Sequence, residues 1–177
     1  NYIVFFPSYR YMETCAELFR RHYPAIPLHV QGAAMTPQER QAFLERFETF
    51  GEMQLHFCVL GGMFAEGIDF SGERLIGVGL PMINPESDFV KEHFDAQGKP
   101  GYHFAYTFPG MNKVLQAMGR VIRTKKDSGI IVLIDDRYLT PLYRSLFPPH
   151  YRHALCVRDN LRLETLIRAF WQKRSEQ

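Results

Sequence analysis

The stretch Gln116–Arg123 reads QAMGRVIR and has the pattern of an amphipathic helix. At about 100° of turn per residue, its polar positions share one face and its apolar positions share the other. The polar face holds Gln116, Gly119, Arg120 and Arg123. Two guanidinium groups separated by a glycine suit a polyphosphate, because their planar forks match phosphate oxygens and stay charged. The stretch predicts an anion-binding helix packed on a sheet, although a surface helix with solvated arginines has the same pattern.

Short apolar segments alternate with longer helical patterns along the rest of the chain. This alternation is typical of βαβ units and of a parallel sheet covered by helices on both faces. We therefore expect an α/β fold of three layers with a mostly parallel central sheet. The expected strands are 2–6, 28–30, 55–60, 75–80 and 130–134; the expected helices are 11–22, 37–50, the arginine stretch, a short helix to about 147, and 158–173.

One helix start is marked by its sequence. Thr36 precedes a proline, and Glu39 follows three residues later. This is the pattern of a capping box, in which the threonine and the glutamate bond each other's backbone N–H groups.

We interpret residues 1–177 as a single domain. Residues 82–109 are rich in proline, glycine and aromatic residues, and we expect an irregular, insertion-like segment with one helix near 87–95. Residues 156–177 are expected to hold a C-terminal helix. The chain opens on a strand pattern without an initiator methionine, which predicts a domain cut from a larger protein.

Composition excludes several classes of protein. A chain of 177 residues that is 46% hydrophobic can bury one sizeable core. The net charge of +2 means that any nucleic-acid surface must be a local patch. Three widely spaced cysteines support neither a disulfide framework nor a metal site, so no metal ligand is predicted. No apolar run approaches the ~20 residues of a membrane span, and we expect a cytoplasmic protein without membrane contact.

A glycine-rich loop follows the expected third strand. Residues 62–70 have the form G-x-x-x-E-G-I-D-F. Closely spaced glycines expose backbone N–H groups and let a phosphate or sugar approach. The carboxylate of Asp69 accepts hydrogen bonds and suits a ribose hydroxyl or an arginine. A flexible loop in which Asp69 caps local backbone is an equal alternative on this motif alone.

Three segments together resemble motifs IV, V and VI of superfamily 2 helicases of the XPD/DinG group. They are the strand end FFPSY at 5–9, the loop at 62–70 and the Q-x-x-G-R-x-I-R helix at 116–123. Their order and spacing agree with the family, and the resemblance covers nearly the whole chain, least well at 82–109. It implies a RecA-like fold of the P-loop NTPase type. It also implies the second motor domain of an ATP-dependent DNA helicase, in which ATP binds between two such domains.

The resemblance implies a role for each polar residue of the arginine stretch. Arg123 is similar to the arginine finger that reaches the γ-phosphate, and Arg120 to a second phosphate contact. Both would stabilise charge that develops during phosphoryl transfer. Gln116 would orient phosphate, water or the neighbouring domain.

Further cofactor-binding residues follow from the same resemblance. Gly67 and Asp69 would approach the nucleotide sugar or link the ATP cleft to the DNA site. Glu66 is expected to act more as a structural partner of an arginine, and Gly119 leaves the space between the arginines open.

The nucleic-acid track is implied at the ends of the strands. Contacts there would go mainly to the phosphate backbone of one DNA strand. The residues are Ser8, Tyr9, Gln31, Gly61 and Gly62. The aromatic residues at 104, 106 and 108 could stack on bases, but core packing is the favoured reading.

Two motifs of a complete motor are missing. The sequence has no G-x-x-x-x-G-K-[ST] phosphate loop and no D-E-A-H-type box. We therefore expect the ligands of ATP-bound magnesium mainly in a first RecA-like domain, and no ATP hydrolysis by this chain alone. An iron–sulfur cluster, where the parent has one, belongs to that first half. The expected partners are that domain and single-stranded DNA, in a monomer.

Two rival functions stay open. One is a non-catalytic domain that binds nucleotide or nucleic acid and regulates a partner, which would not need Arg123. The other is a Rossmann-type enzyme, disfavoured because no G-x-G-x-x-G follows the first strand.

Overall fold

A computed structural model describes residues 2–48, 53–62, 64, 73–79, 87–121 and 128–175. By contacts the chain divides into two compact units, Asn1–Ser145 and Leu146–Gln177. The second unit contains the 3-10 turn η4 (Pro149–Tyr151) and the helix α7 (Asn160–Ser175). The sheet and the candidate site belong to the first unit.

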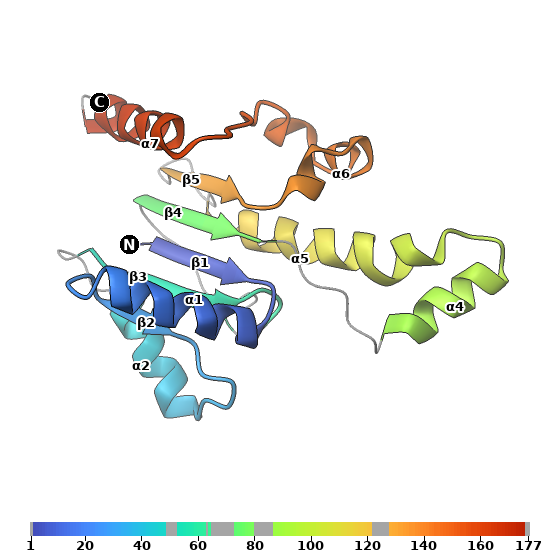
Figure 1. The fold of residues 1–177 in the computed structure, drawn as a ribbon, viewed down its shortest axis with the longest axis horizontal. Helices are drawn as coiled ribbons and strands as arrows, with labels where there is room; N and C mark the ends of the chain where they lie inside the picture. Colours follow the sequence, from blue (N-terminus) through green and yellow to red (C-terminus); the bar gives the residue numbers. More distant parts are fainter. Residues whose placement is uncertain are drawn as a thin grey trace. The chain divides into compact units, whose positions relative to one another are not determined.

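The first unit is built on a five-stranded, all-parallel sheet in the order β2-β3-β1-β4-β5 (Figure 1). Each strand lies near its predicted position, and the predicted α/β architecture with a parallel central sheet is confirmed. The strands are β1 (Tyr2–Phe6), β2 (Leu28–Val30), β3 (Leu55–Val59), β4 (Glu73–Val78) and β5 (Ser128–Leu133).

Helices follow the strands as the alternation predicts. Those of the first unit are α1 (Tyr9–His22), α2 (Pro37–Glu48), α4 (Asp88–Ala96), the π-helix η2 (His103–Thr107), α5 (Phe108–Met118), the 3-10 helix η3 (Asp136–Leu139) and α6 (Pro141–Ser145). The predicted capping box is present: Glu39 N donates to Thr36 Oγ1 at 3.2 Å, and Thr36 N donates to Glu39 Oε2 at 2.8 Å.

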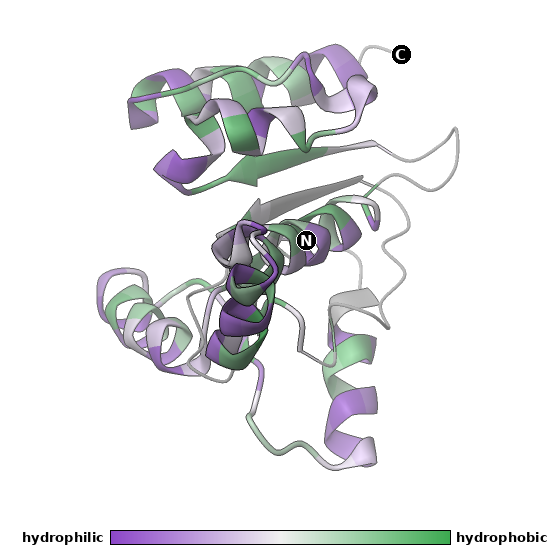
Figure 2. Ribbon diagram, turned by 90° about the vertical axis from the view of Figure 1, so that its right-hand side faces the viewer, coloured by the Kyte–Doolittle hydropathy of each residue, from purple (hydrophilic) through white to green (hydrophobic). Residues whose placement is uncertain are grey.

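Helices cover both faces of the sheet. On one face, Met12 and Ala16 of α1 pack with Phe6, Phe57 and Val59 in a buried cluster. Side chains alternate along a strand, so the neighbours of these strand residues point to the opposite face. There the ring of Phe43 in α2 lies edge-on to the ring of His56, at 5.2 Å between centroids. Figure 2 shows helices that combine hydrophilic and hydrophobic residues, as helices covering a sheet do.

The segment expected to be irregular is largely helical. The helix predicted near 87–95 is present as α4, but residues 101–109 are helical as well. The chain passes into α5 through the π-type turn η2, in which Phe108 N donates to the carbonyl of His103. Pro109, which lacks an N–H donor, lies in the first turn of α5. One long helix, drawn yellow in Figure 1, therefore precedes the arginines.

The stability of the sheet is expected to depend on the protonation of His29. Its ring lies 4.9 Å from the ring of His56 on the neighbouring strand. Burial lowers the pKa of His29, and the positive charge of Arg46 lowers it further. The unfolded chain, with a histidine pKa of about 6.5, therefore binds this proton more readily than the folded chain does. The stabilising contribution is present above about pH 6.5 and is lost as pH falls through the lower pKa of the folded state.

We expect His29→Gln to reduce the loss of unfolding free energy between about pH 7.5 and about pH 5. Urea unfolding of both chains at the two pH values measures it. An equal loss in wild type and variant would contradict the assignment.

Candidate functional site

The carboxyl ends of the parallel strands meet at one edge of the sheet, where α/β proteins bind ligands. Ser8 and Tyr9 follow β1, Gln31 follows β2, and Gly61 and Gly62 follow β3. The five residues predicted to contact nucleic acid therefore share this edge. Ser8 is the cap of α1, where its Oγ accepts a hydrogen bond from Tyr11 N at 3.3 Å.

Gln31 is an internal brace at this edge. Its side chain is only 2% exposed. Its Oε1 accepts from Val59 N at 2.9 Å, and its Nε2 donates to the hydroxyl of Tyr9 at 2.7 Å. The sequence indicated a direct contact of Gln31 with DNA, but both polar atoms of the amide are engaged within the protein. Gln31 instead ties the end of β3 to the start of α1.

An added side chain at either glycine of the Gly61–Gly62 turn would meet its neighbours. Gly61 has φ +75°, which favours glycine, and Gly62 N donates to the carbonyl of Val59 at 3.0 Å. The loop pattern predicted backbone N–H groups that are open to a phosphate. In the structure the N–H of Gly62 is already hydrogen-bonded within the turn. A Cβ on Gly62 would lie 3.0 Å from Gln31 Nε2, and a Cβ on Gly61 would lie 2.8 Å from Cδ of Lys113.

The arginine stretch is helical only in its first part. The helix α5 ends at Met118, and the next residues form turns, whereas the pattern predicted a helix to Arg123. Gly119 N still donates to Leu115 O, but Arg120 N donates to Ala117 O, three residues back. Such tightening satisfies the last carbonyls of a helix and is frequent at its C-terminus.

Among the described residues of the stretch, the apolar face is largely buried and the polar face is at least partly exposed, as the pattern predicted. Val114, Met118 and Val121 are buried, whereas Gln116 is exposed and Arg120 is half-buried. A Cβ on the exposed Gly119 would approach Leu115 O at 3.3 Å, a carbonyl of its own helix. In Figure 1, α5 lies on the side of the sheet to which the strand arrows point, with its last turn nearest the strands. Lys113 of the same helix lies against Gly61, so α5 passes the strand ends before the chain continues into the arginine stretch.

Four predicted site residues lie outside the described part of the chain. They are Arg123, Glu66, Gly67 and Asp69.

Sequence reasoning missed Lys113. It precedes Gln116 by three residues and Arg120 by seven, so extending the same helical period one turn back would have placed it on the polar face. The prediction began the polar face only at Gln116, the first residue of the motif.

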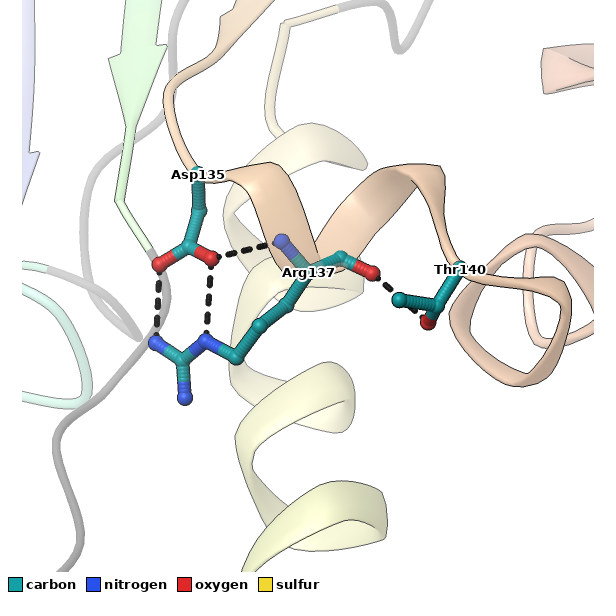
Figure 3. Close-up of polar contacts among 3 residues, drawn as sticks. All are labelled: Asp135, Arg137 and Thr140. Carbon is teal, nitrogen blue, oxygen red and sulfur yellow. Dashed lines mark hydrogen bonds and ion pairs between the residues drawn. The ribbon is translucent and has the colours of Figure 1, made fainter.

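An ion pair at the end of β5 was also missed. Asp135 Oδ1 accepts from N and Nε of Arg137, both at 2.9 Å, and Oδ2 accepts from Nη2 at 2.8 Å (Figure 3). Burial raises the pKa of Asp135, but the hydrogen bonds from Arg137 outweigh it and hold the pKa below its usual value. The pair fixes the chain where it leaves the sheet.

The aromatic residues at 104, 106 and 108 pack within the helical arm made by α4, η2 and α5. Phe104 stacks on Phe94 at 4.2 Å between centroids and meets Phe108 edge-on at 5.4 Å. The hydroxyl of Tyr106 donates to Asp88, and this hydrogen bond raises the pKa of Tyr106 to about 12. These half-buried side chains therefore contact other residues of the helical arm.

Within the described residues, no three histidine, cysteine, aspartate or glutamate side chains are placed to hold a metal ion. No helix in the same part of the chain is long and apolar enough to span a membrane.

Comparisons with known proteins place the chain in a family. Residues 1–154 match the family model described as helicase C-terminal domain. A probable ATP-dependent helicase of Methanocaldococcus jannaschii, MJ0942, is 30% identical over 78% of this chain and 24% of its own length. The general transcription and DNA repair factor IIH helicase subunit XPD/RAD3 of Saccharomyces cerevisiae is 30% identical over 77% of this chain and 19% of its own length. Human regulator of telomere elongation helicase 1 is 31% identical over 89% of this chain and 15% of its own length.

Solved structures support the same fold. Apo XPD superposes with a TM-score of 0.59 at 22% identity, over 82% of this chain and 30% of that one. Domain 2 of the DEAD-box helicase Mss116p, bound to an RNA duplex, superposes with a TM-score of 0.51 at 16% identity, over 82% of this chain and 47% of that one. The chain spans a quarter or less of these curated relatives. It belongs to the helicase C-terminal domain family, and the relatives that it matches include XPD/RAD3.

Proposed function

We propose that this chain is the second motor domain of an ATP-dependent DNA helicase. In this proposal ATP binds between it and a first RecA-like domain of the same protein, and the strand-end edge forms part of a single-stranded DNA track. The observation that carries it is the meeting of two groups of residues at one edge. The helix α5 brings Lys113 to Gly61 at this edge and continues into the arginine stretch, and β1, β2 and β3 bring Tyr9, Gln31 and the Gly61–Gly62 turn.

The nucleotide side is assigned to the end of α5. Arg120 and Arg123 would stabilise charge on the transferring phosphoryl group, and Gln116 would orient the phosphate or water. Gly119 adds no side chain between them. Gly67 and Asp69 keep their role near the nucleotide sugar or between the ATP cleft and the DNA site, and Glu66 keeps its role as the structural partner of an arginine.

Magnesium is assigned mainly to the first motor domain. The donors that α5 offers are guanidinium and carboxamide groups, which suit phosphate oxygens. Magnesium instead prefers carboxylates, water and the phosphates themselves. This chain would therefore complete an ATP site rather than form one, and would not hydrolyse ATP alone.

The DNA-binding side is assigned to the strand ends, and the role proposed for Gln31 changes. Ser8, Tyr9 and the Gly61–Gly62 turn line the track, whereas the buried Gln31 holds Tyr9 in place. Contacts of this kind go to the phosphate backbone and carry no base sequence.

The test is ATP hydrolysis by the full-length protein, measured as phosphate release with and without single-stranded DNA. We expect DNA to stimulate turnover, and we expect this chain alone to release no phosphate above background. The alternative, a regulatory domain with a RecA-like fold, predicts DNA or nucleotide binding without stimulated hydrolysis. That outcome would overturn the motor assignment.

A further inference from the structure

Lys113 lies across the turn that ends β3. A Cβ built on Gly61 would be 2.8 Å from Cδ, 2.9 Å from Cε and 3.1 Å from Nζ of Lys113. The lysine comes from the middle of α5, far from Gly61 in sequence, so the fold alone brings them together. Its aliphatic stem covers the glycine, and its ammonium group lies at the carboxyl end of the strand.

The ammonium group of Lys113 is open to a ligand. The residue is exposed, and no carboxylate within the described ranges forms an ion pair with it. A lysine beside a backbone turn binds phosphate as a point charge. The absence of a side chain at Gly61 is what leaves room for this lysine, since a Cβ there would displace it.

A second donor lies on the other side of the same turn. Val59 N can only donate, so the oxygen of the Gln31 amide must face it, and the nitrogen must face Tyr9. The hydroxyl of Tyr9 therefore accepts from Gln31, and its own hydrogen points elsewhere. Among the described residues no acceptor takes that hydrogen. Tyr9 thus provides an O–H donor at the carboxyl-end edge of the sheet, where Lys113 provides a positive charge.

We propose that Lys113 and Tyr9 flank the Gly61–Gly62 turn as a two-point grip on consecutive phosphates of single-stranded DNA, an inference that rests on the proposed function. Phosphates of ATP share this chemistry. The nucleic-acid backbone fits better, because Lys113 lies on the turn after β3, whose second glycine faces Gln31, the partner of Tyr9, rather than at the helix end that carries Arg120. Because both contacts go to phosphate and not to a base, this two-point grip does not depend on the DNA sequence.

The experiment is binding of the full-length protein to a fluorescent oligothymidylate, followed by anisotropy over a series of salt concentrations. Each phosphate neutralised on a single strand contributes about 0.7 to the slope of log K against log salt. We expect Lys113→Gln to lower that slope by about 0.7 and to weaken binding about fivefold at about 0.1 M salt. Lys113→Arg should keep the slope. Tyr9→Phe removes a neutral donor, so it should weaken binding about two- to tenfold with the slope unchanged.

Lys99→Gln is the matched control. Lys99 lies in the loop between α4 and η2, over the ring of Phe94, and its replacement should leave both the salt slope and the affinity unchanged.

The same variants are assayed for the KM of ATP. An unchanged salt slope in Lys113→Gln would overturn the grip while the motor assignment stands. A raised KM for ATP with an unchanged slope would assign Lys113 to the nucleotide. Failure of the wild type to bind single-stranded DNA would overturn the proposed function itself.

Discussion

ATP turnover by the full-length protein, measured with single-stranded DNA present, is expected to fall at least about a hundredfold when Arg123 is replaced by alanine. An arginine finger stabilises charge on the transferring phosphoryl group, and its removal affects the transition state more than the ground state. The KM for ATP and the affinity for DNA should therefore change little. Arg123 lies outside the described residues, so this expectation rests on the family motif and on the outward-facing Gln116 that precedes it on α5.

Steady-state hydrolysis and anisotropy with the same oligonucleotide separate these effects. Arg21→Ala, an exposed arginine in the last turn of α1, is the control for simple loss of positive charge and should keep wild-type turnover. If turnover were unchanged in Arg123→Ala, the arginine stretch would be a binding or structural face. The regulatory alternative would then be favoured.

The free energy of unfolding of the chain is expected to fall by about 2–3 kcal/mol in Gln31→Ala. The substitution leaves the N–H of Val59 without its acceptor at a buried strand end and removes the donor to Tyr9. An unsatisfied buried donor costs about 1–3 kcal/mol, and the space left by the side chain adds to it. This expected loss is a large part of the stability of an ordinary domain.

Gln41→Ala in α2 is the matched control. Gln41 is exposed and donates to Glu45 at 3.1 Å, so its replacement should change stability by less than about 0.5 kcal/mol. Urea unfolding of both variants measures the difference. Similar effects of the two substitutions would mean that the Gln31 amide does not brace the sheet.

The sequence by itself determined the local structure. Short apolar runs marked all five strands, and the Thr36–Glu39 pattern marked a helix start that the structure reproduces atom by atom. The apolar side of the arginine stretch was also correct, since Val114, Met118 and Val121 are buried. These features depend on residues close in the chain, whose spacing is visible in the sequence.

Its motifs also predicted the family, which the match over residues 1–154 confirms. The site was predicted in part. The alternation of strands and helices put Tyr9, Gln31 and the Gly61–Gly62 turn at one edge, because carboxyl ends of parallel strands meet there. It did not indicate which of these residues faces solvent.

Only the tertiary structure decided how the edge is built. Gln31 is buried because the order β2-β3-β1 puts it against Val59, 28 residues away, and against Tyr9, 22 residues away. Lys113 reaches Gly61 because the helix continues through Pro109 and α5 packs back on the strand ends. Periodicity depends on near neighbours, whereas these contacts depend on strand order and helix packing. No local pattern carries that information, because it arises only when the sheet forms.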